Sequence, residues 1–316
     1  MVLLQISEPG ESPDLSLTRS IAVGIDLGTT NSLIAQFDGA QVRVFEDELG
    51  QPSLPSVVHY GAESTQVGDA ALALANEQPE NTIASAKRML GRAREEVVDD
   101  PYASLTTDGA LAFATDQGKK TPVEVSAAIL DALKIRAEAH LDSPIAGAVI
   151  TVPAYFDDAQ RQATRQAAEL AGIKVLRLLN EPTAAAVAYG LDEQAEESSL
   201  LAVYDLGGGT FDISILRMRA GLFEVLATGG DSALGGDDFD REIARYAMTE
   251  LGITDPTSRQ RRTLLSLARH AKQALSESSD VQIDGSGLGS NVPPLSLTRH
   301  TLETLIGPYI QRTLIA

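Results

Sequence analysis

The stretch Val203-Tyr204-Asp205-Leu206-Gly207-Gly208-Gly209-Thr210-Phe211-Asp212 organises the rest of the chain. Apolar residues before it predict a buried strand, and the apolar/polar alternation after it predicts a second strand. The three glycines between them predict a hairpin tip without Cβ atoms, where a row of backbone N–H groups suits phosphate oxygens. Asp205 would face the same space, where a carboxylate is tolerated beside a cation. The stretch therefore predicts a site for a phosphate chain and a divalent metal. Taken alone, it is equally compatible with a glycine hairpin that binds nothing.

A second copy of this layout changes the balance between these interpretations. Asp26-Leu27-Gly28-Thr29-Thr30-Asn31-Ser32 also follows an apolar strand and precedes an alternating one. Two such hairpins far apart in one chain indicate a duplicated fold, with two lobes that face each other across a cleft. We expect each lobe to contribute one hairpin and one aspartate, Asp26 or Asp205, to a single site.

Composition excludes several classes of function. The 316-residue chain has a formal net charge of -19, which argues against nucleic acid as a partner. It has no cysteine, which excludes disulfides and thiolate metal sites and fits a cytoplasmic location. Residues 1–20 lack the features of a signal peptide, and we expect a flexible leader there. No apolar run is long enough to span a bilayer, so no membrane partner is expected.

Periodicity predicts alternating helices and strands along the chain. The predicted helices cover 69–76, 81–90, 121–140, 157–170, 181–190, 237–251, 258–276 and 299–314. Further strands are predicted at 41–47, 56–60, 145–152, 175–179 and 222–228, with a hairpin at 281–297. The helix at 258–276 is rich in basic residues, and the last helix continues to the end of the chain, so we expect a fragment.

Acidic residues and hydroxyls near the glycine tips complete the predicted chemistry. Magnesium prefers oxygen ligands and is often held through water, a role that suits Asp26 and Asp205. Glu181, at a helix start, could orient a water toward a terminal phosphate. The hydroxyls of Thr29, Thr30 and Thr210 add possible donors, and Gly235-Gly236 precedes a helix in a position that suits an anion or a ribose. Taken singly, each carboxylate, Asp212 included, could equally be an ordinary cap or turn residue. No P-loop motif and no H-E-x-x-H motif occurs.

These motifs resemble a known family. Residues 26–32, 205–214, Asn180-Glu181-Pro182-Thr183-Ala184-Ala185-Ala186 and Thr151-Val152-Pro153-Ala154-Tyr155-Phe156 are similar to the nucleotide-binding domain of DnaK-type heat-shock chaperones. Residues 3–10, 54–60 and 227–238 are similar in particular to the HscA branch, which serves iron–sulfur cluster assembly. The resemblance runs from about residue 21 to the end of the chain. It implies an α/β, actin-like (ribonuclease-H-like) ATPase fold of two lobes, each with a mixed sheet and helices, truncated before the end of the second lobe.

The resemblance also implies roles for individual residues. ATP or ADP would bind with Mg²⁺, and K⁺ is a further expected ion. Asp26, Glu181 and Asp205 would surround the hydrated metal, and together with Thr210 they would form the catalytic set. The nucleotide contacts would be Gly28, Thr29, Thr30, Asn31, Gly207, Gly208, Gly209, Thr210, Gly235, Gly236, Lys272 and Ser276. Pro153 and Arg161 would relay the nucleotide state, and Arg177 would lie on the surface used by a J-domain co-chaperone.

Two departures from the family pattern stand out. The family is expected to carry a water-positioning lysine in a Gly-Asp-Ala-Ala-Lys context, but here Gly68-Asp69-Ala70-Ala71 is followed by Leu72. Leucine cannot donate to water or phosphate, so slow hydrolysis is expected. Arg269 stands where the family often has a ribose-contacting glutamate.

The resemblance predicts the ATP-binding, slowly hydrolysing domain of a chaperone for iron–sulfur cluster assembly and protein folding. The expected division is a leader (1–20), lobe I (21–197, with a peripheral subdomain at about 39–120) and an incomplete lobe II (198–316). The expected client is an iron–sulfur scaffold protein, bound by a substrate-binding domain outside this chain. A small-molecule kinase and a filament-forming protein of the same superfamily are the alternatives.

Overall fold

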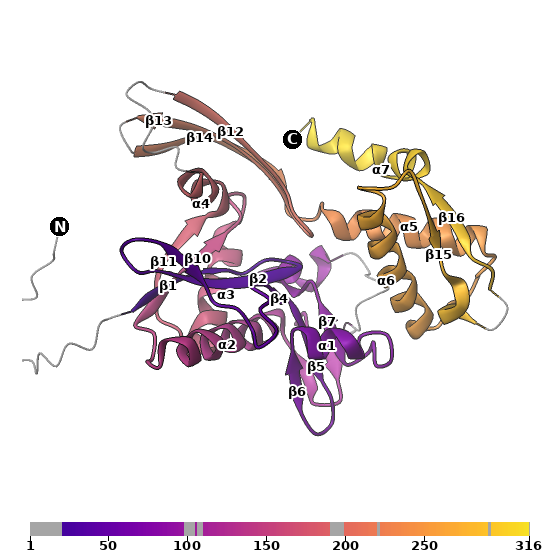
Figure 1. Ribbon diagram of the computed structural model, residues 1–316, viewed down its shortest axis with the longest axis horizontal. Coiled ribbons are helices and arrows are strands. Elements are labelled where there is room, and N and C mark those ends of the chain that lie inside the picture. The colour runs from indigo at the N-terminus through magenta and orange to yellow at the C-terminus, as the bar shows by residue number, and fades with distance from the viewer. Residues whose placement is uncertain are drawn as a thin grey trace, which may run out of the picture.

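The computed structural model describes residues 21–97, 105, 110–189, 199–219, 222–289 and 292–315 of the chain (Figure 1). The leader predicted at residues 1–20 lies outside these residues. We call residues 21–189 lobe I and residues 199–315 lobe II. Within the described residues, no helix is both long and apolar enough to cross a membrane.

The centre of lobe I is a mixed sheet with the strand order β11-β10-β1-β2-β3, in which β4 also pairs with β2. Its strands are β1 (Ala22–Asp26), β2 (Asn31–Phe37), β3 (Val42–Val44), β4 (Leu54–Pro55), β10 (Gly147–Val152) and β11 (Val175–Asn180). β1 is antiparallel to β2 and parallel to β10, so the first predicted hairpin is confirmed. Parallel pairing requires crossover connections, and these contain α2 (Pro122–Leu141) and α3 (Asp158–Leu170), which cover the sheet together (Figure 1).

Both crossover helices begin where the sequence predicts. Thr121 caps α2 by accepting a hydrogen bond from the Glu124 N–H, while the Glu124 side chain accepts from the Thr121 N–H. Asp157 caps α3 in the same way with Gln160. Buried α2 side chains such as Leu130 join sheet residues such as Ile25 and Ile150 in one core. This core holds the carboxyl end of β1, and therefore Asp26, in place.

The peripheral part of lobe I contains two further small sheets. The first has the order β6-β5-β7, from β5 (Val57–Tyr60), β6 (Thr65–Val67) and β7 (Thr82–Ala84), and α1 (Asp69–Leu74) packs beside it. The second pairs β8 (Phe113–Thr115) with β9 (Gly118–Lys120), and a short 3₁₀ helix, η2, covers Arg94–Glu96.

The helix predicted at 81–90 is wrong. Residues 82–84 form β7, and a 3₁₀ helix, η1 (Ala86–Met89), follows. Ile83 pairs with Val58 on β5, a tertiary contact that helix propensity does not reveal. Ser85 then adopts the left-handed conformation (φ 57°), which an α-helix cannot contain. The turn at Ser85 directs η1 toward the junction of the two lobes.

Lobe II has two parts (Figure 1). The first is an antiparallel sheet of β12 (Ser199–Leu206), β13 (Phe211–Arg219) and β14 (Leu222–Asp231), against which α4 (Glu181–Ala188) packs. The second contains α5 (Gly236–Glu250), α6 (Ser258–Ala274), η3 (Gly285–Leu288), α7 (Arg299–Thr313) and the hairpin of β15 (Asp280–Ile283) and β16 (Leu295–Thr298). Its separate core includes Ile243, Leu264 and Leu297. The glycine tip that joins β12 to β13 confirms the second predicted hairpin.

Candidate functional site

The two glycine tips touch each other. A Cβ built on Gly208 would lie 2.1 Å from the Thr30 hydroxyl oxygen, and one on Gly209 would lie 2.6 Å from the methyl carbon of Thr29. The second tip is closed by the Gly207 N–H, which donates to the Thr210 carbonyl (2.9 Å). Residues far apart in the sequence therefore form one surface, as the duplicated hairpins predict. Glycine is required there because any side chain would separate the tips.

Gly235 and Gly236 bring the start of α5 to the same place. The N–H groups of Gly236 and Asp237 donate to the carbonyls of Gly207 (2.9 Å) and Gly208 (2.7 Å). A Cβ on Gly235 would lie 2.6 Å from the Gly208 carbonyl carbon. Among the described residues, no backbone hydrogen bond uses the N–H of Gly208 or Gly209. The second tip thus offers donors to a ligand bound against it.

In the first hairpin, Gly28 and Asn31 define the turn. A Cβ on Gly28 would lie 2.0 Å from the Asn31 carbonyl oxygen, so only glycine fits this tight turn. Ser56 donates its hydroxyl hydrogen to the Gly28 carbonyl (2.8 Å) and ties the tip to β4. The turn is therefore rigidly attached to lobe I.

Asp26, Asp205 and Glu181 stand at the ends of β1 and β12 and at the start of α4. They are close enough to influence one another: burial raises the pKa of Glu181, and the charges of Asp26 and Asp205 raise it further against the lowering effect of Lys87. Burial likewise raises the pKa of Asp205, with Lys87 opposing it and Asp26 adding to it. Like charges held together in this way favour a cation as ligand.

The three carboxylates do not form a direct metal site. Among the described residues, no group of three or more acidic, histidine or cysteine side chains has an arrangement that could hold an ion by itself. The Asp26 carboxylate already accepts a hydrogen bond from Thr151 (2.9 Å). This chemistry fits Mg²⁺ held through its own waters, because that ion keeps several of them.

Lys87 is a candidate site residue that sequence reasoning missed. It lies on η1, its side chain is only 6 % exposed, and its ammonium donates to Glu181 Oε1 (2.8 Å). The ammonium also lies 5.8 Å from the centre of the Phe156 ring. The available signal was the Ala86-Lys87-Arg88 run, but it fell within a segment predicted to be helical.

The inference of slow hydrolysis from Leu72 is therefore corrected. Leu72 lies on α1 with 43 % of its surface exposed, and it lines a different cavity. An ammonium group reaches the carboxylates from Lys87 instead. The absence of lysine at position 72 removes no donor from the site.

A turn after β10 connects lobe I to lobe II. The backbone N–H of Tyr155 donates to the Asp212 carboxylate of β13 (3.0 Å). Arg161 holds the same turn by donating to the carbonyls of Phe156 (3.0 Å) and Pro153 (3.5 Å). Asp212 is only 2 % exposed, and burial raises its pKa despite the lowering effect of the Tyr155 hydrogen bond. The predicted relay residues Pro153 and Arg161 thus contact each other beside the site.

Arg177 lies apart from the glycine tips. It is exposed on β11, at the edge of the lobe I sheet. That position leaves its guanidinium accessible to another protein.

Lys272 and Ser276 differ in their relation to the site. Lys272 donates to the Gly236 carbonyl (2.8 Å) and pairs with Asp240 (2.6 Å). Ser276 is exposed beyond the end of α6, and its carbonyl accepts a hydrogen bond from Arg299 (3.4 Å). Lys272 is therefore next to the glycine cluster, whereas Ser276 is oriented by the neighbouring α7.

Arg269 neutralises buried acids between α5 and α6. It pairs with Asp237 (2.8 Å) and with Asp240 (2.9 Å), which is 2 % exposed. The negative charges of Asp237 and Asp240 raise the pKa of Arg269 against the lowering effect of burial, the largest single influence. The guanidinium that replaces the expected glutamate thus has a structural use here.

A cavity of about 470 Å³ adjoins these ion pairs. Leu72 and Ser85 line it from lobe I, and Asp237, Arg269 and His270 line it from α5 and α6. The cavity therefore lies between the lobes and gives access to the start of α5.

Replacing Gly208 with alanine is expected to weaken ATP binding about 10- to 100-fold, because overpacking of this kind costs about 1–3 kcal/mol. The added methyl group would meet the Thr30 hydroxyl at 2.1 Å. Calorimetric titration measures the effect. Gly24→Ala is the matched control, since a Cβ there would meet only the Ala35 carbonyl oxygen at 4.0 Å. Equal affinities for the two variants would show that the tips do not need to meet.

Comparisons with known proteins agree with this geometry. A profile of the family described as Hsp70 protein matches residues 22–316. A protein of Vibrio parahaemolyticus named "Chaperone protein HscA homolog" is 53% identical over 322 residues, which cover 100% of this chain and 51% of that protein. Proteins of the same name from Vibrio atlanticus and Pseudomonas aeruginosa are 51% and 53% identical, over 100% and 99% of this chain and 51% and 50% of their own lengths. The chain thus spans about half the length of these relatives.

Hsp70 nucleotide-binding domains have the actin-like ATPase fold, and the mixed α/β architecture confirms the predicted fold class. The comparisons do not favour the kinase or filament alternatives. The match covers both glycine hairpins, the three carboxylates and Lys87. The chain belongs to the Hsp70 protein family.

Proposed function

We propose that this chain is the ATP-binding and ATP-hydrolysing domain of a molecular chaperone. The observation that carries the proposal is the meeting of two glycine tips, one from each lobe, beside Asp26, Glu181 and Asp205. Glycine cradles that a Cβ would fill, unused N–H groups and mutually repelling carboxylates all fit a triphosphate with a cation. ATP and ADP with Mg²⁺ are the ligands we assign, with K⁺ as a further ion.

Each part of the site has a task in this proposal. The tips, with Thr29, Thr30 and Thr210, bind phosphate oxygens, and Lys272 with the Gly235-Gly236 pair and Ser276 serves the adenosine side. Asp26, Asp205 and Glu181 hold the hydrated metal, which when bound neutralises charge on the phosphates. Glu181 and the ammonium of Lys87 together orient a water for attack.

The wider role is proposed from the family. Three relatives of about twice the length carry the name "Chaperone protein HscA homolog". We propose that the whole protein assists iron–sulfur cluster assembly and protein folding in the cytoplasm, with a scaffold protein as client and a J-domain co-chaperone docking near Arg177. Pro153 and Arg161 would pass the nucleotide state on from the turn that contacts Asp212. The proposed division places lobe I at residues 21–197 and lobe II from residue 198 onward.

Calorimetric titration of the full-length protein with ATP, with and without Mg²⁺, tests this function. We expect metal-dependent binding, and phosphate release without an added acceptor. Absence of metal-dependent binding would refute the site. Phosphate transfer that needs a small-molecule acceptor would indicate a kinase instead.

The contribution of Mg²⁺ to ATP affinity is expected to fall as the pH is lowered from neutrality, before ordinary carboxylates begin to protonate. The pKa values of Glu181 and Asp205 are raised above their usual 4.5 and 3.8. Their protonated forms attract no cation, so protons compete with the metal. The same raised pKa values add stability to the nucleotide-free protein at low pH, and that stability is lost as the pH rises through them.

The measurement is the shift in unfolding temperature caused by Mg²⁺ and ATP across this pH range. It should grow with pH, while the shift caused by ATP in chelator changes less. A metal-dependent shift that stays constant with pH would contradict the assignment of these carboxylates.

A further inference from the structure

One buried guanidinium at the glycine tips has unused hydrogen-bonding capacity. The Arg88 side chain lies on η1 and is nine-tenths buried. Its Nη2 donates to both carboxylate oxygens of Asp238 on α5, at 3.0 and 3.1 Å. Its Nη1 is also buried, yet no described residue accepts a hydrogen bond from it, and the Asp237 carboxylate is 4.0 Å away. Leaving such a donor unpaired is costly unless a ligand completes it.

The position of Arg88 points to the nature of that ligand. Its Cγ and Cδ lie over Gly209, at 2.6 and 2.7 Å from where a Cβ on that glycine would be. Gly209 belongs to the tip assigned to phosphate, and its N–H makes no backbone hydrogen bond within the described part of the chain. Arginine matches phosphate oxygens well because its planar fork offers several donors at once.

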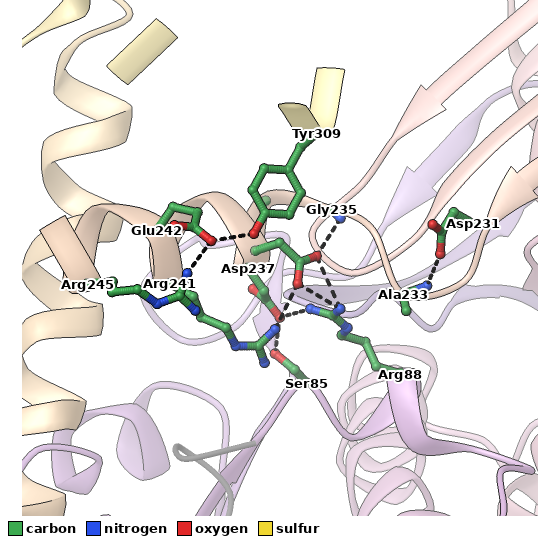
Figure 2. Close-up of polar contacts among 12 residues, drawn as sticks. Ser85, Arg88, Asp231, Ala233, Gly235, Asp237, Arg241, Glu242, Arg245 and Tyr309 are labelled. Atoms are coloured by element: carbon green, nitrogen blue, oxygen red, sulfur yellow. Dashed lines mark hydrogen bonds and ion pairs between the residues drawn. The ribbon is translucent and has the colours of Figure 1, made fainter. Parts of the chain in front are cut away.

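Arg88 is also part of a polar contact between the lobes (Figure 2). Figure 2 shows Arg88 and Ser85 of lobe I facing Asp237 at the start of α5, and Ser85 donates to Asp237 (2.5 Å). Asp238 also accepts hydrogen bonds from the Gly235 N–H (2.8 Å) and from Arg241 (3.0 Å). Asp238 therefore keeps two partners when Arg88 turns to another acceptor.

We propose that Arg88 is a phosphate-binding residue shared between two states: it holds Asp238 across the lobes without nucleotide and donates to a nucleotide phosphate when one is bound. The proposal rests on the proposed ATP site. It makes Asp238 a competitor of the phosphate for the same guanidinium. Nucleotide binding then weakens the Arg88–Asp238 contact between the lobes, and re-formation of that contact favours release of the nucleotide.

Competition predicts effects of opposite sign for the two partners. In the full-length protein, Arg88→Met should lower ATP affinity about 10- to 100-fold, the usual effect of losing a hydrogen bond to a charged group. The affinity for AMP, which lacks the outer phosphates, should change less than about twofold. Asp238→Asn keeps one acceptor oxygen, which the Gly235 N–H can use, but it removes the negative charge and the second acceptor that hold Arg88, so it should raise ATP affinity. The double variant should behave like Arg88→Met.

Controls separate this role from a purely structural one. Arg92→Met is the matched control, because Arg92 also reaches lobe II, donating to Ser232 (2.6 Å). It should leave the ratio of ATP to AMP affinity unchanged. Arg88→Lys keeps the charge and the aliphatic stem, so it should bind ATP more tightly than Arg88→Met. It also replaces Arg88→Met as the test variant if Arg88→Met folds poorly. Unfolding temperatures without nucleotide, measured for every variant, identify any loss of folding.

The affinities distinguish failure of this proposal from failure of the proposed function. An unchanged ATP-to-AMP ratio in both Arg88 variants would overturn the proposal, as would equal weakening of ATP binding by Arg88→Met and Asp238→Asn. The second pattern would mean that the pair only joins the lobes. If the wild-type protein itself fails to bind ATP, the proposed function fails first, and the wild-type titration shows this before any variant is compared.

Discussion

Replacing Lys87 with methionine is expected to lower the rate of single-turnover ATP hydrolysis by the full-length protein about 10²- to 10³-fold, the usual effect of losing one well-placed donor. The Lys87 ammonium is buried and lies 2.8 Å from Glu181 Oε1. Its charge opposes the raised pKa values of Glu181 and Asp205 and, together with the charge of Arg161, that of Asp212. Among the described residues no other lysine acts on Glu181 or Asp205, so the variant lacks an ammonium that could fix the attacking water or stabilise charge on the terminal phosphate.

Leu72→Lys is the informative comparison for Lys87. Leu72 is exposed on α1 and lines the cavity between α1 and α6. A lysine there should leave the hydrolysis rate within about twofold of wild type, since surface substitutions rarely alter a distant site. A large gain in rate with Leu72→Lys, or full activity in Lys87→Met, would return the water-positioning role to position 72. Because methionine keeps the aliphatic bulk of lysine, loss of activity with an unchanged unfolding temperature identifies the charge as the cause.

Asp205→Asn is expected to remove most of the dependence of ATP affinity on Mg²⁺. Asp205 stands near the end of β12, beside the second glycine tip, and its charge acts on Glu181. Loss of a carboxylate that holds a metal through water usually costs about 10- to 100-fold in metal affinity. The neutral amide also removes one of the repelling charges, so affinity for ATP in chelator should rise slightly or stay the same.

Titration with and without Mg²⁺ measures both parts of this prediction. Asp131→Asn is the control, because Asp131 is a half-exposed acid on α2 that pairs with Lys134, away from the cleft. It makes the same change in net charge. If Asp205→Asn and Asp131→Asn alter the metal dependence equally, the effect is one of overall charge, and Asp205 has no specific part in metal binding.

The relation between sequence and structure is clearest in the elements around the site. The two hairpins, the helix starts near residues 121 and 157, and the start of α4 at Glu181 all follow from local patterns, and each is confirmed. These features depend on neighbours within a few residues, where glycine conformations and capping hydrogen bonds act. The segment 81–90 failed because pairing of β7 with β5 outweighed its helix propensity.

Lys87 was missed for the same reason. Its position beside Glu181 depends on the left-handed turn at Ser85 and on the path of η1 across the lobe junction. The expected motif places a lysine only at position 72. It does not reveal that Lys87, from a later segment, reaches Glu181. Arg88 shares this origin, because its partner Asp238 is 150 positions away in the sequence.

By itself the sequence determined the two-lobed fold, the glycine tips, the three carboxylates and the family, because short motifs specify these features through interactions between neighbouring residues. Only the tertiary structure decided that Lys87 is the cation beside the carboxylates, that the tips touch, and that Arg88 Nη1 donates to no described residue. Those outcomes depend on packing between distant segments, where the free energy of burying and pairing charges exceeds any local preference.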